Sequence, residues 1–351
     1  MTRLTLVTEI PAPYRIPLFN ALAELVDLRV VFLAERNPLR PYRLHEDELR
    51  FRWEVLPNAD FELGQRWLVL NRGIVRRLRG SDALLLGGWN QPAFWASLAY
   101  ARATRTPALL WVESTLRDTA TRAGRAKRVL AAAASGFVVP GRASAEYVRA
   151  IDSGARVVEA PNAVDGALFA SRRGERDDLR RTLGLDGCVL LVVGRLAAEK
   201  GVDLLLRAAA GIDGVQVVVA GTGPEEARLR ALAPDARFLG NVERDDLPRW
   251  YAAADVLVLP SRSEPWGMAL NEGAAAGLPL VASDAAGAAW ELVDDGVNGY
   301  RVPAGDVGAL RERLVELAGD AELRAAQGAA SVRIAARFTP AAWADAVAAA
   351  L

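Results

Sequence analysis

Apolar residues recur along the chain as short continuous runs separated by longer stretches that have one polar face. A short apolar run is typical of a parallel strand buried on both sides, and an amphipathic stretch is typical of the helix that covers it. Their alternation predicts βαβ units and a doubly wound α/β fold. The first half has predicted strands at Leu4–Val7, Leu28–Leu33, Ala83–Leu86, Ala108–Val112 and Gly136–Val139, and predicted helices at Pro17–Val26, Arg66–Arg79, Gln91–Ala103, Arg125–Ala134 and Arg142–Ala150.

The same alternation restarts after a highly charged segment, Ser171–Asp186, which has the composition of a linker or an exposed first element. We therefore predict two Rossmann-like domains, at residues 1–168 and 187–336, joined by a linker at 169–186 and followed by a final helical segment at 337–351. The second domain has predicted strands at Val189–Val193, Val215–Ala220, Arg237–Leu239, Val256–Leu259, Leu280–Ala282 and Tyr300–Val302. Its predicted helices are Gly201–Ala210, Glu225–Ala233, Pro248–Ala253, Met268–Ala275, Val307–Ala318 and Ala321–Ala336, and the last helix is Ala341–Leu351.

The composition excludes several kinds of structural and catalytic site. Among 351 residues there is one cysteine, Cys188, and one histidine, His45, which excludes a disulfide framework and metal sites rich in cysteine or histidine. A Ser-His-Asp triad would have to use His45. The N-terminus lacks the apolar core of a signal peptide and no apolar run is long enough to span a bilayer, so we expect a cytoplasmic protein.

Charge is balanced overall but unevenly distributed. Residues 1–170 hold 23 Lys/Arg and 17 Asp/Glu, a net charge of +6, and residues 171–351 hold 20 and 26, a net charge of −6. The basic half could attract an anionic acceptor or membrane surface, or dock on the acidic half; we expect no nucleic acid as partner. The predicted helix Arg66–Arg79 combines arginines with an apolar stripe, which fits either an anionic membrane surface or a solvated arginine face.

Three loops that follow predicted strands could bind a ligand. In the first, Gly194, Arg195 and Lys200 lie between a strand and a helix start, a pattern that suits a diphosphate or an exposed loop with two solvated cations. In the second, Glu264 precedes a helix that carries Glu272 among small apolar residues, where a carboxylate needs a partner. Such carboxylates can accept from sugar hydroxyls. In the third, residues 217–230, the glycine pattern of a dinucleotide site is broken by Glu226.

Loops of the first domain also follow strands and are candidates for binding an acceptor. Pro-rich residues 9–17 carry Tyr14 and Arg15, Trp89 follows one strand, and Glu113 follows another. Each of these side chains could equally serve packing or capping.

Several spaced motifs resemble those of the family 4 retaining glycosyltransferases, which have the two-domain GT-B fold with two Rossmann-like domains facing across a cleft. The resemblance covers essentially the whole chain and is sharpest over 189–303. The matching motifs are IPAPYR (10–15), PNAVD (161–165), GRLAAEKGVD (194–203), VVVAGTGPE (217–225), FLGNV (238–242), EPWGMALNEGAAAGLPLVASDAAG (264–287) and ELVDDGVNGYRVPAGD (291–306).

The resemblance implies transfer of a sugar, with retention at the anomeric carbon, from a nucleoside diphosphate sugar to an acceptor hydroxyl, with no metal and no further cofactor. Arg195 and Lys200 would hold the diphosphate, Glu264 the donor sugar, and Glu272 the ribose. The final helix would pack on the first domain. The remaining implied donor contacts are Gly194, Asn241, Val242, Gly267, Met268 and Ala269.

The chain departs from the family on the acceptor side. The loop after the first strand is Pro-Tyr-Arg where many members have glycines, and Glu113-Ser114 stands where many have histidine. Glu113 is therefore a candidate general base. The competing hypotheses are a nucleotide-sugar epimerase or hydrolase of the same fold, a non-catalytic partner subunit, and a dehydrogenase, which Glu226 disfavours.

Overall fold

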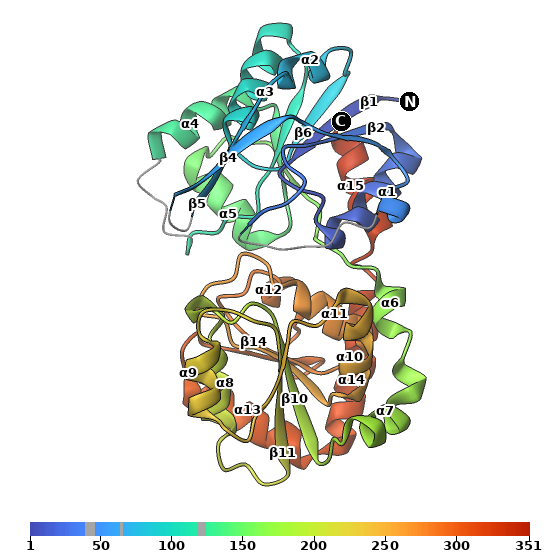
Figure 1. Cartoon of the computed structure of the whole chain (residues 1–351), viewed down its shortest axis with the longest axis vertical. Coiled ribbons are helices and arrows are strands. Elements are labelled where there is room, and N and C mark those ends of the chain that lie inside the picture. Colours follow the sequence, from blue (N-terminus) through green and yellow to red (C-terminus); the bar gives the residue numbers. More distant parts are fainter. Residues whose placement is uncertain (39–45, 64–65, 118–123) are drawn as a thin grey trace. The chain divides into compact units, whose positions relative to one another are not determined.

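The computed structural model describes residues 1–38, 46–63, 66–117 and 124–351. Within them the chain forms two units: Met1–Val164 with Pro340–Leu351, and Asp165–Thr339. His45 lies outside the described residues. Both units are built on an all-parallel sheet with helices on both faces (Figure 1), which confirms the predicted α/β class.

The first unit contains a seven-stranded sheet in the order β3-β2-β1-β6-β7-β8-β9. Successive side chains of a strand point to opposite faces, so Leu6 joins the core under α1 and α15 while Val7 joins the core under the other helices. The strands are β1 (Arg3–Thr8), β2 (Asp27–Phe32), β3 (Arg52–Val55), β6 (Ala83–Leu86), β7 (Ala108–Trp111), β8 (Gly136–Val139) and β9 (Val157–Glu159). The helices are α1 (Ile16–Leu25), α2 (Ile74–Leu78), α3 (Pro92–Thr104), α4 (Gly124–Ala133) and α5 (Arg142–Ile151), with 3₁₀ turns η1 (Pro13–Arg15) and η2 (Glu46–Glu48).

The predicted helix Arg66–Arg79 is wrong. Residues Arg66–Asn71 form strand β5, which pairs antiparallel with β4 (Asn58–Leu63), and only Ile74–Leu78 is helical. Trp67 and Val69 are buried while Leu70 is exposed, which is the two-residue period of a strand. Gly73, at φ +82°, then separates the strand from α2.

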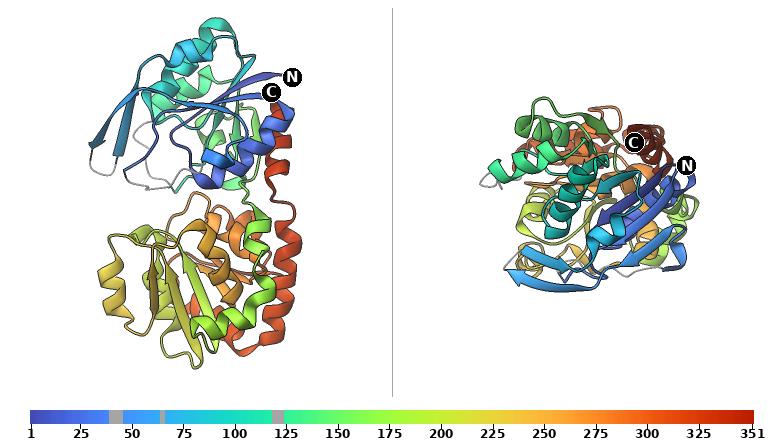
Figure 2. Two further views of the ribbon diagram at one scale, coloured as in Figure 1. Left: turned by 45° about the vertical axis from the view of Figure 1, so that its right-hand side comes forward. Right: turned by 90° about the horizontal axis from the view of Figure 1, so that it is seen from above.

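The last helix, α15 (Pro340–Ala350), belongs to the first unit, where it packs along α1 (Figure 2). The Trp343 side chain is fully buried, with ring centroids 5.0 Å from Trp111 and 6.3 Å from Phe19. This aromatic cluster ties residues at the end of the sequence into the core of the first sheet.

The second unit has a six-stranded sheet in the order β12-β11-β10-β13-β14-β15. Figure 1 shows α8 and α13 on one side of this sheet and α10, α11 and α14 on the other. The strands are β10 (Cys188–Val193), β11 (Val215–Ala220), β12 (Arg237–Gly240), β13 (Val256–Leu259), β14 (Leu280–Ser283) and β15 (Gly299–Val302). The helices are α6 (Gly166–Ala170), α7 (Arg176–Leu183), α8 (Val202–Ala209), α9 (Glu226–Leu232), α10 (Leu247–Ala253), α11 (Met268–Ala276), α12 (Ala289–Leu292), α13 (Val307–Gly319) and α14 (Ala321–Ala335), with 3₁₀ turns η4 (Arg173–Glu175), η5 (Ala198–Lys200) and η6 (Arg244–Asp246).

Residues 169–186, predicted as a linker, contain the regular helix α7 in the second unit. Arg176 and Arg180 of this helix form ion pairs of 2.6 and 2.8 Å with Asp255, which directly precedes β13. These two arginines of the charged segment therefore bind the domain to which α7 belongs.

Each sheet has a point where the chain order reverses, between β1 and β6 in the first and between β10 and β13 in the second. Loops leaving the carboxyl ends of two such strands run in opposite directions and open a crevice in which α/β proteins bind ligands. In the second sheet, a ligand is therefore expected at the reversal between β10 and β13.

Candidate active site

The loops after β10 and β13 bring together two residues predicted from the sequence, Lys200 and Glu264. Lys200 ends η5, which follows β10, and its Nζ donates to the Glu264 carboxylate beyond β13. The side chains are 25% and 11% exposed, so the ion pair lies at the reversal point and remains accessible. It is placed to meet a ligand at the carboxyl edge of the second sheet.

Arg195 follows Gly194 in the loop after β10, and its side chain is 55% exposed. Its Nη2 donates to Glu199 at 2.5 Å across one turn of the loop. A guanidinium has five N–H donors, so this contact leaves most of its hydrogen-bonding capacity for a ligand.

The loops after β10 and β11 are in direct backbone contact. The Leu196 amide donates to Thr222 at 2.8 Å, and a Cβ on Gly221 would lie only 1.9 Å from the Gly194 carbonyl oxygen. Gly221 is therefore required for this packing.

Helix α11 begins at the same edge. Gly267 precedes it at φ +105°, and a Cβ there would lie 2.6 Å from a Leu259 methyl group. Within the part of the chain that the structure describes, the amides of Met268 and Ala269 donate no hydrogen bond. These free donors at a helix N-terminus favour an anionic group nearby.

Glu272 lies one turn further along α11 and is partly buried. Its carboxylate accepts from the Tyr251 hydroxyl of α10 at 2.5 Å, which supplies the partner that the apolar surroundings require. Burial raises the pKa of Glu272 to about 7, and the Tyr251 hydrogen bond opposes that rise. Tyr251 is fully buried and packs edge-on against Phe169, with ring centroids 5.5 Å apart.

Tyr251 and Arg262 were not predicted from the sequence. Arg262 forms two 2.8 Å hydrogen bonds with buried Asp203 of α8, and its amide donates to Glu199 at 2.7 Å. These bonds fix the loop after β13 against η5, the two segments that carry Glu264 and Lys200. The two-point contact between the Arg262 guanidinium and the Asp203 carboxylate could not be predicted from the sequence, because the two residues are 59 positions apart.

Asn241 and Val242 follow β12, two strands from β10 in the sheet. Two strand spacings place them about 10 Å from the exit of β10. The Asn241 side chain is exposed and donates to Glu243 at 3.1 Å. The predicted donor-side residues thus all follow β10, β12 or β13.

The predicted acceptor-side residues lie in the first unit. Arg15 is nearly buried, stacks 4.4 Å from the centroid of the Trp111 ring and pairs with Glu113 at 3.0 Å. Glu113 also accepts from Asn162 at 2.8 Å, so each of its carboxylate oxygens has a donor. Burial acts to lower the pKa of Arg15, but its interactions with Tyr14, Glu113 and Glu9 outweigh burial and the pKa is raised.

Tyr14 and Trp89 are also at the carboxyl edge of the first sheet. Tyr14 packs partly buried against the core, and the Arg15 guanidinium lies 5.6 Å from its ring centroid. Trp89 is 9% exposed and packs against Tyr147, while the Lys127 ammonium lies 5.3 Å from its ring centroid. Trp89 is therefore mainly a packing residue.

No group of three or more His, Cys, Asp or Glu side chains that could hold a metal ion occurs among the described residues. None of the helices within those residues combines the length and apolar character needed to cross a bilayer.

Comparison with known proteins bears on this site directly. Residues 187–320 match the family model of the glycosyl transferases group 1. This domain belongs to the group 1 glycosyltransferase family. The matched range contains every predicted donor-side residue, from Gly194 to Glu272.

Two curated relatives are similar to part of the chain. A D-inositol 3-phosphate glycosyltransferase from Mycobacterium sp. (strain KMS) is 40% identical over 149 residues, which are 38% of this chain and 34% of that protein. A GDP-mannose-dependent alpha-mannosyltransferase from Corynebacterium glutamicum is 38% identical over 126 residues, 34% of this chain and 29% of that protein. The matched regions thus span about a third of the length of each of these relatives.

The fold of the whole chain also matches solved structures. Anabaena Alr3699/HepE, solved in complex with UDP and glucose, aligns with a TM-score of 0.81 at 22% identity and covers 100% of this chain and 99% of that one. WaaG, a glycosyltransferase of lipopolysaccharide biosynthesis, aligns with a TM-score of 0.69 at 15% identity and 98% coverage of both chains. The two parallel-sheet domains of the chain therefore have the predicted GT-B fold.

Proposed function

We propose that the protein transfers a hexosyl group from a nucleoside diphosphate sugar to a hydroxyl of an acceptor, with retention at the anomeric carbon. The observation that carries the proposal is the Lys200–Glu264 ion pair at the strand-order reversal between β10 and β13. The family match over this domain supports it. So do the relatives and neighbours described as acting on GDP-mannose or binding UDP and glucose.

Negative charge develops on the diphosphate as the bond to the sugar breaks. Arg195 and Lys200 carry positive charge on the loop after β10, and the free amides of Met268 and Ala269 point out of the start of α11. Fixed donors of this kind stabilise a leaving group more in the transition state than in the bound donor. In this proposal they take the place of a metal ion.

Carboxylates position the rest of the donor. Glu264 is held by Lys200 and accepts from hydroxyls of the sugar, while Glu272, held by Tyr251, accepts from the two ribose hydroxyls. The base extends toward Asn241 and Val242, about 10 Å from the exit of β10. The nucleoside thus follows the carboxyl edge of the sheet.

On the acceptor side we propose contacts from Tyr14, Arg15, Trp89 and Glu113. Because Glu113 already accepts from Arg15 and Asn162, we assign it to orienting Arg15 instead of removing the acceptor proton. The departing phosphate oxygen takes that proton, which suits attack from the same face and hence retention.

We further propose a cytoplasmic enzyme that contacts the inner membrane face through helices α2, α3 and α4. Exposed arginines on these helices or directly beside them include Arg76, Arg79, Arg102 and Arg128. None of the three helices contains an acidic residue. Exposed apolar side chains accompany them: Val75, Trp95 and Val129 are 40%, 49% and 70% exposed. A basic surface with apolar side chains fits a bilayer that contains anionic lipid.

The proposal is tested with purified protein, a panel of nucleotide sugars and hydroxyl acceptors. We expect nucleoside diphosphate release only when both a donor and an acceptor are present, at a rate that EDTA leaves within about twofold, since Arg195 and Lys200 supply the positive charge. Release without acceptor would support a hydrolase or epimerase instead. Loss of activity in EDTA, restored by added Mg²⁺ or Mn²⁺, would contradict the metal-independent step.

A further inference from the structure

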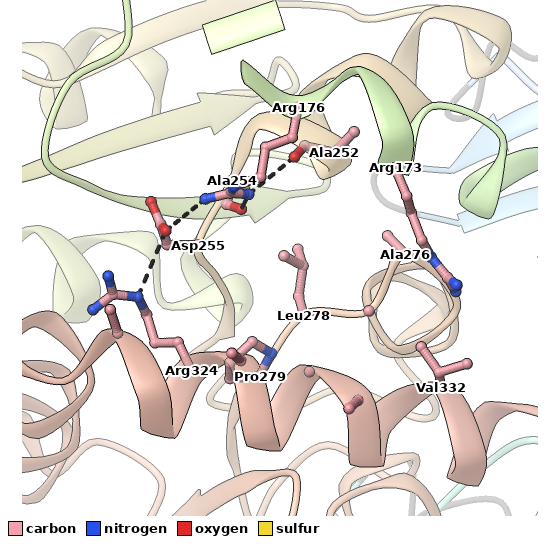
Figure 3. A pocket seen from close by; sticks show the side chains of 15 residues that line it. Arg173, Arg176, Ala252, Ala254, Asp255, Ala276, Leu278, Pro279, Arg324 and Val332 are labelled. Carbon is pink, nitrogen blue, oxygen red and sulfur yellow. Dashed lines mark hydrogen bonds and ion pairs between the residues drawn. The ribbon is translucent and has the colours of Figure 1, made fainter. Parts of the chain in front are cut away.

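The second unit contains a cavity of about 540 Å³ that is separate from the donor-side residues (Figure 3). Its lining includes Asp255 and Pro279, which directly precede β13 and β14. It therefore opens at the amino edge of the sheet, whereas the Lys200–Glu264 pair lies at the carboxyl edge. Helix α11 connects the two regions, because Met268 begins it and Ala276 at its other end lines the cavity.

The lining carries more positive than negative charge. Three arginines, Arg173, Arg176 and Arg324, face one acidic residue, Asp255, among the described residues that form the wall. Figure 3 shows Arg176 and Arg324 both directed at Asp255, with N–O separations of 2.6 and 3.6 Å. Arg180, from outside the cavity, uses the other Asp255 oxygen at 2.8 Å. The one carboxylate is thus already shared among three guanidinium groups.

Arg173 stands on the opposite side of the cavity and has no carboxylate partner among the described residues. One of its nitrogens donates to the Ala275 carbonyl, and its buried Nε has no hydrogen-bond partner. Burial lowers the pKa of this guanidinium, as expected for a cation without a counter-charge. A partly buried cation in this state is stabilised by an anion.

The remaining wall is apolar and formed by small side chains together with Leu278, Pro279 and Val332. A ligand that fits this cavity therefore has an anionic group that lies between the arginines and a short aliphatic part that packs against the apolar wall. The lining itself has three guanidinium groups and one carboxylate, an excess of two positive charges to which Arg180 adds from outside the wall. A phosphomonoester carries about −1.5 to −2 at pH 7. Planar guanidinium groups also suit two-point contact with phosphate oxygens.

We propose that this cavity is a binding site for a small phosphomonoester, with Arg173 as its principal charged contact. The site uses none of the donor-side residues, so it is independent of the proposed transfer reaction. A ligand here contacts the end of α11 that lies away from Met268, and donor and phosphomonoester can bind at the same time.

The test measures binding of glycerol 3-phosphate, with inorganic phosphate as the probe that lacks a carbon body. Calorimetry and thermal unfolding are run at constant ionic strength, with chloride as the balancing anion and UDP present in excess to fill the donor side. We expect saturable binding that is tighter for glycerol 3-phosphate than for phosphate, because only the former covers the apolar floor.

The deciding variant is Arg173→Gln, with Arg181→Gln as its matched control. Arg181 lies on α7, is exposed, pairs with Asp178 and does not line the cavity. Loss of one charge-assisted contact should weaken binding about tenfold in Arg173→Gln and leave the control unchanged. If Arg173→Gln does not fold, Arg173→Lys is used in its place. This variant keeps the positive charge but loses the planar guanidinium that contacts two phosphate oxygens, and it is expected to weaken binding by a smaller factor. Absence of saturable binding to the wild type, or equal affinity in wild type and the Arg173 variant, would overturn the proposal.

Discussion

At the scale of single residues, the proposed donor side consists of charged groups that each have one protein partner and further hydrogen-bonding capacity. Lys200 holds Glu264, Glu199 holds Arg195, and Tyr251 holds Glu272. A partner that fixes a side chain before the substrate arrives reduces the entropy lost on binding. Residue types and order in the sequence were sufficient to predict the charged groups, whereas Tyr251 is brought to Glu272 only by the packing of α10 on α11.

Donor binding should depend on pH through Glu272. Its pKa is raised to about 7 by burial, so the ionised form that accepts from both ribose hydroxyls is the minor form below that pH and the major form above it. In Tyr251→Phe the opposing hydrogen bond is lost and the midpoint should move to higher pH. The measurement is donor affinity from pH 5.5 to 9 in wild type and variant. A uniform loss of affinity with an unchanged midpoint would show that Tyr251 serves folding alone.

The same shift affects stability. A carboxyl whose pKa is higher folded than unfolded favours the folded state below the unfolded value of 4.5, and that contribution is lost as the pH rises through about 7. Glu272→Gln should therefore unfold at a higher temperature than wild type at pH 8, with the advantage shrinking toward pH 5, in thermal scans without ligand. An advantage that is constant across this range would contradict the raised pKa.

At the scale of elements, the continuous apolar runs were reliable guides. Ala83–Leu86 and Val256–Leu259 are strands with the predicted bounds, because parallel strands buried on both faces need an unbroken apolar run. The prediction of a helix that includes Arg66–Asn71 was wrong, because the apolar residues of this segment also fit a helical spacing with Ile74 and Leu78. Pairing with β4 decided in favour of a strand, and that pairing cannot be derived from either segment alone.

The basic face on α2, α3 and α4 predicts salt-dependent membrane binding. Flotation with vesicles of phosphatidylcholine and phosphatidylglycerol should capture the wild type at low salt. Arg76→Gln with Arg79→Gln should weaken capture roughly 30-fold, from about 1 kcal/mol per charge near an anionic surface. The control is Arg333→Gln with Arg337→Gln, which removes two exposed arginines from the second unit. Equal capture of both double variants, or no capture of the wild type, would refute the membrane contact.

At the scale of the whole molecule, each unit is a doubly wound sheet, and the sequence order of the strands determines where ligands can bind. Both reversal points are joined by polar contacts across the edge: Lys200 to Glu264 in the second unit and Asn90 to Glu9, at 2.6 Å, in the first. The alternation of strands and helices was enough to predict two such sheets. The sequence left open whether Ser171–Asp186 is a linker or an exposed first element of the second domain, because the contacts of α7 with Asp255 join residues far apart in sequence.

The chain end should stabilise the first unit selectively. Trp343 is fully buried against Trp111 and Phe19, so Trp343→Ala should cost about 3–5 kcal/mol of unfolding free energy in that unit. Denaturant unfolding followed by limited proteolysis should show Met1–Val164 opening earlier while Asp165–Thr339 is unchanged. Trp290→Ala, at a 39% exposed position of the second unit, is the control. A loss below about 1 kcal/mol would show that α15 contributes little.

The central claim is that fixed positive charge after β10 stabilises the departing diphosphate. Its most direct test is the turnover number of Lys200→Ala and of Arg195→Ala at saturating donor and acceptor, with Arg207→Ala, an exposed arginine of α8, as control. We predict a fall of ~100-fold or more in each of the first two variants and none in the third. Rates near that of the wild type in both Lys200→Ala and Arg195→Ala would contradict the account.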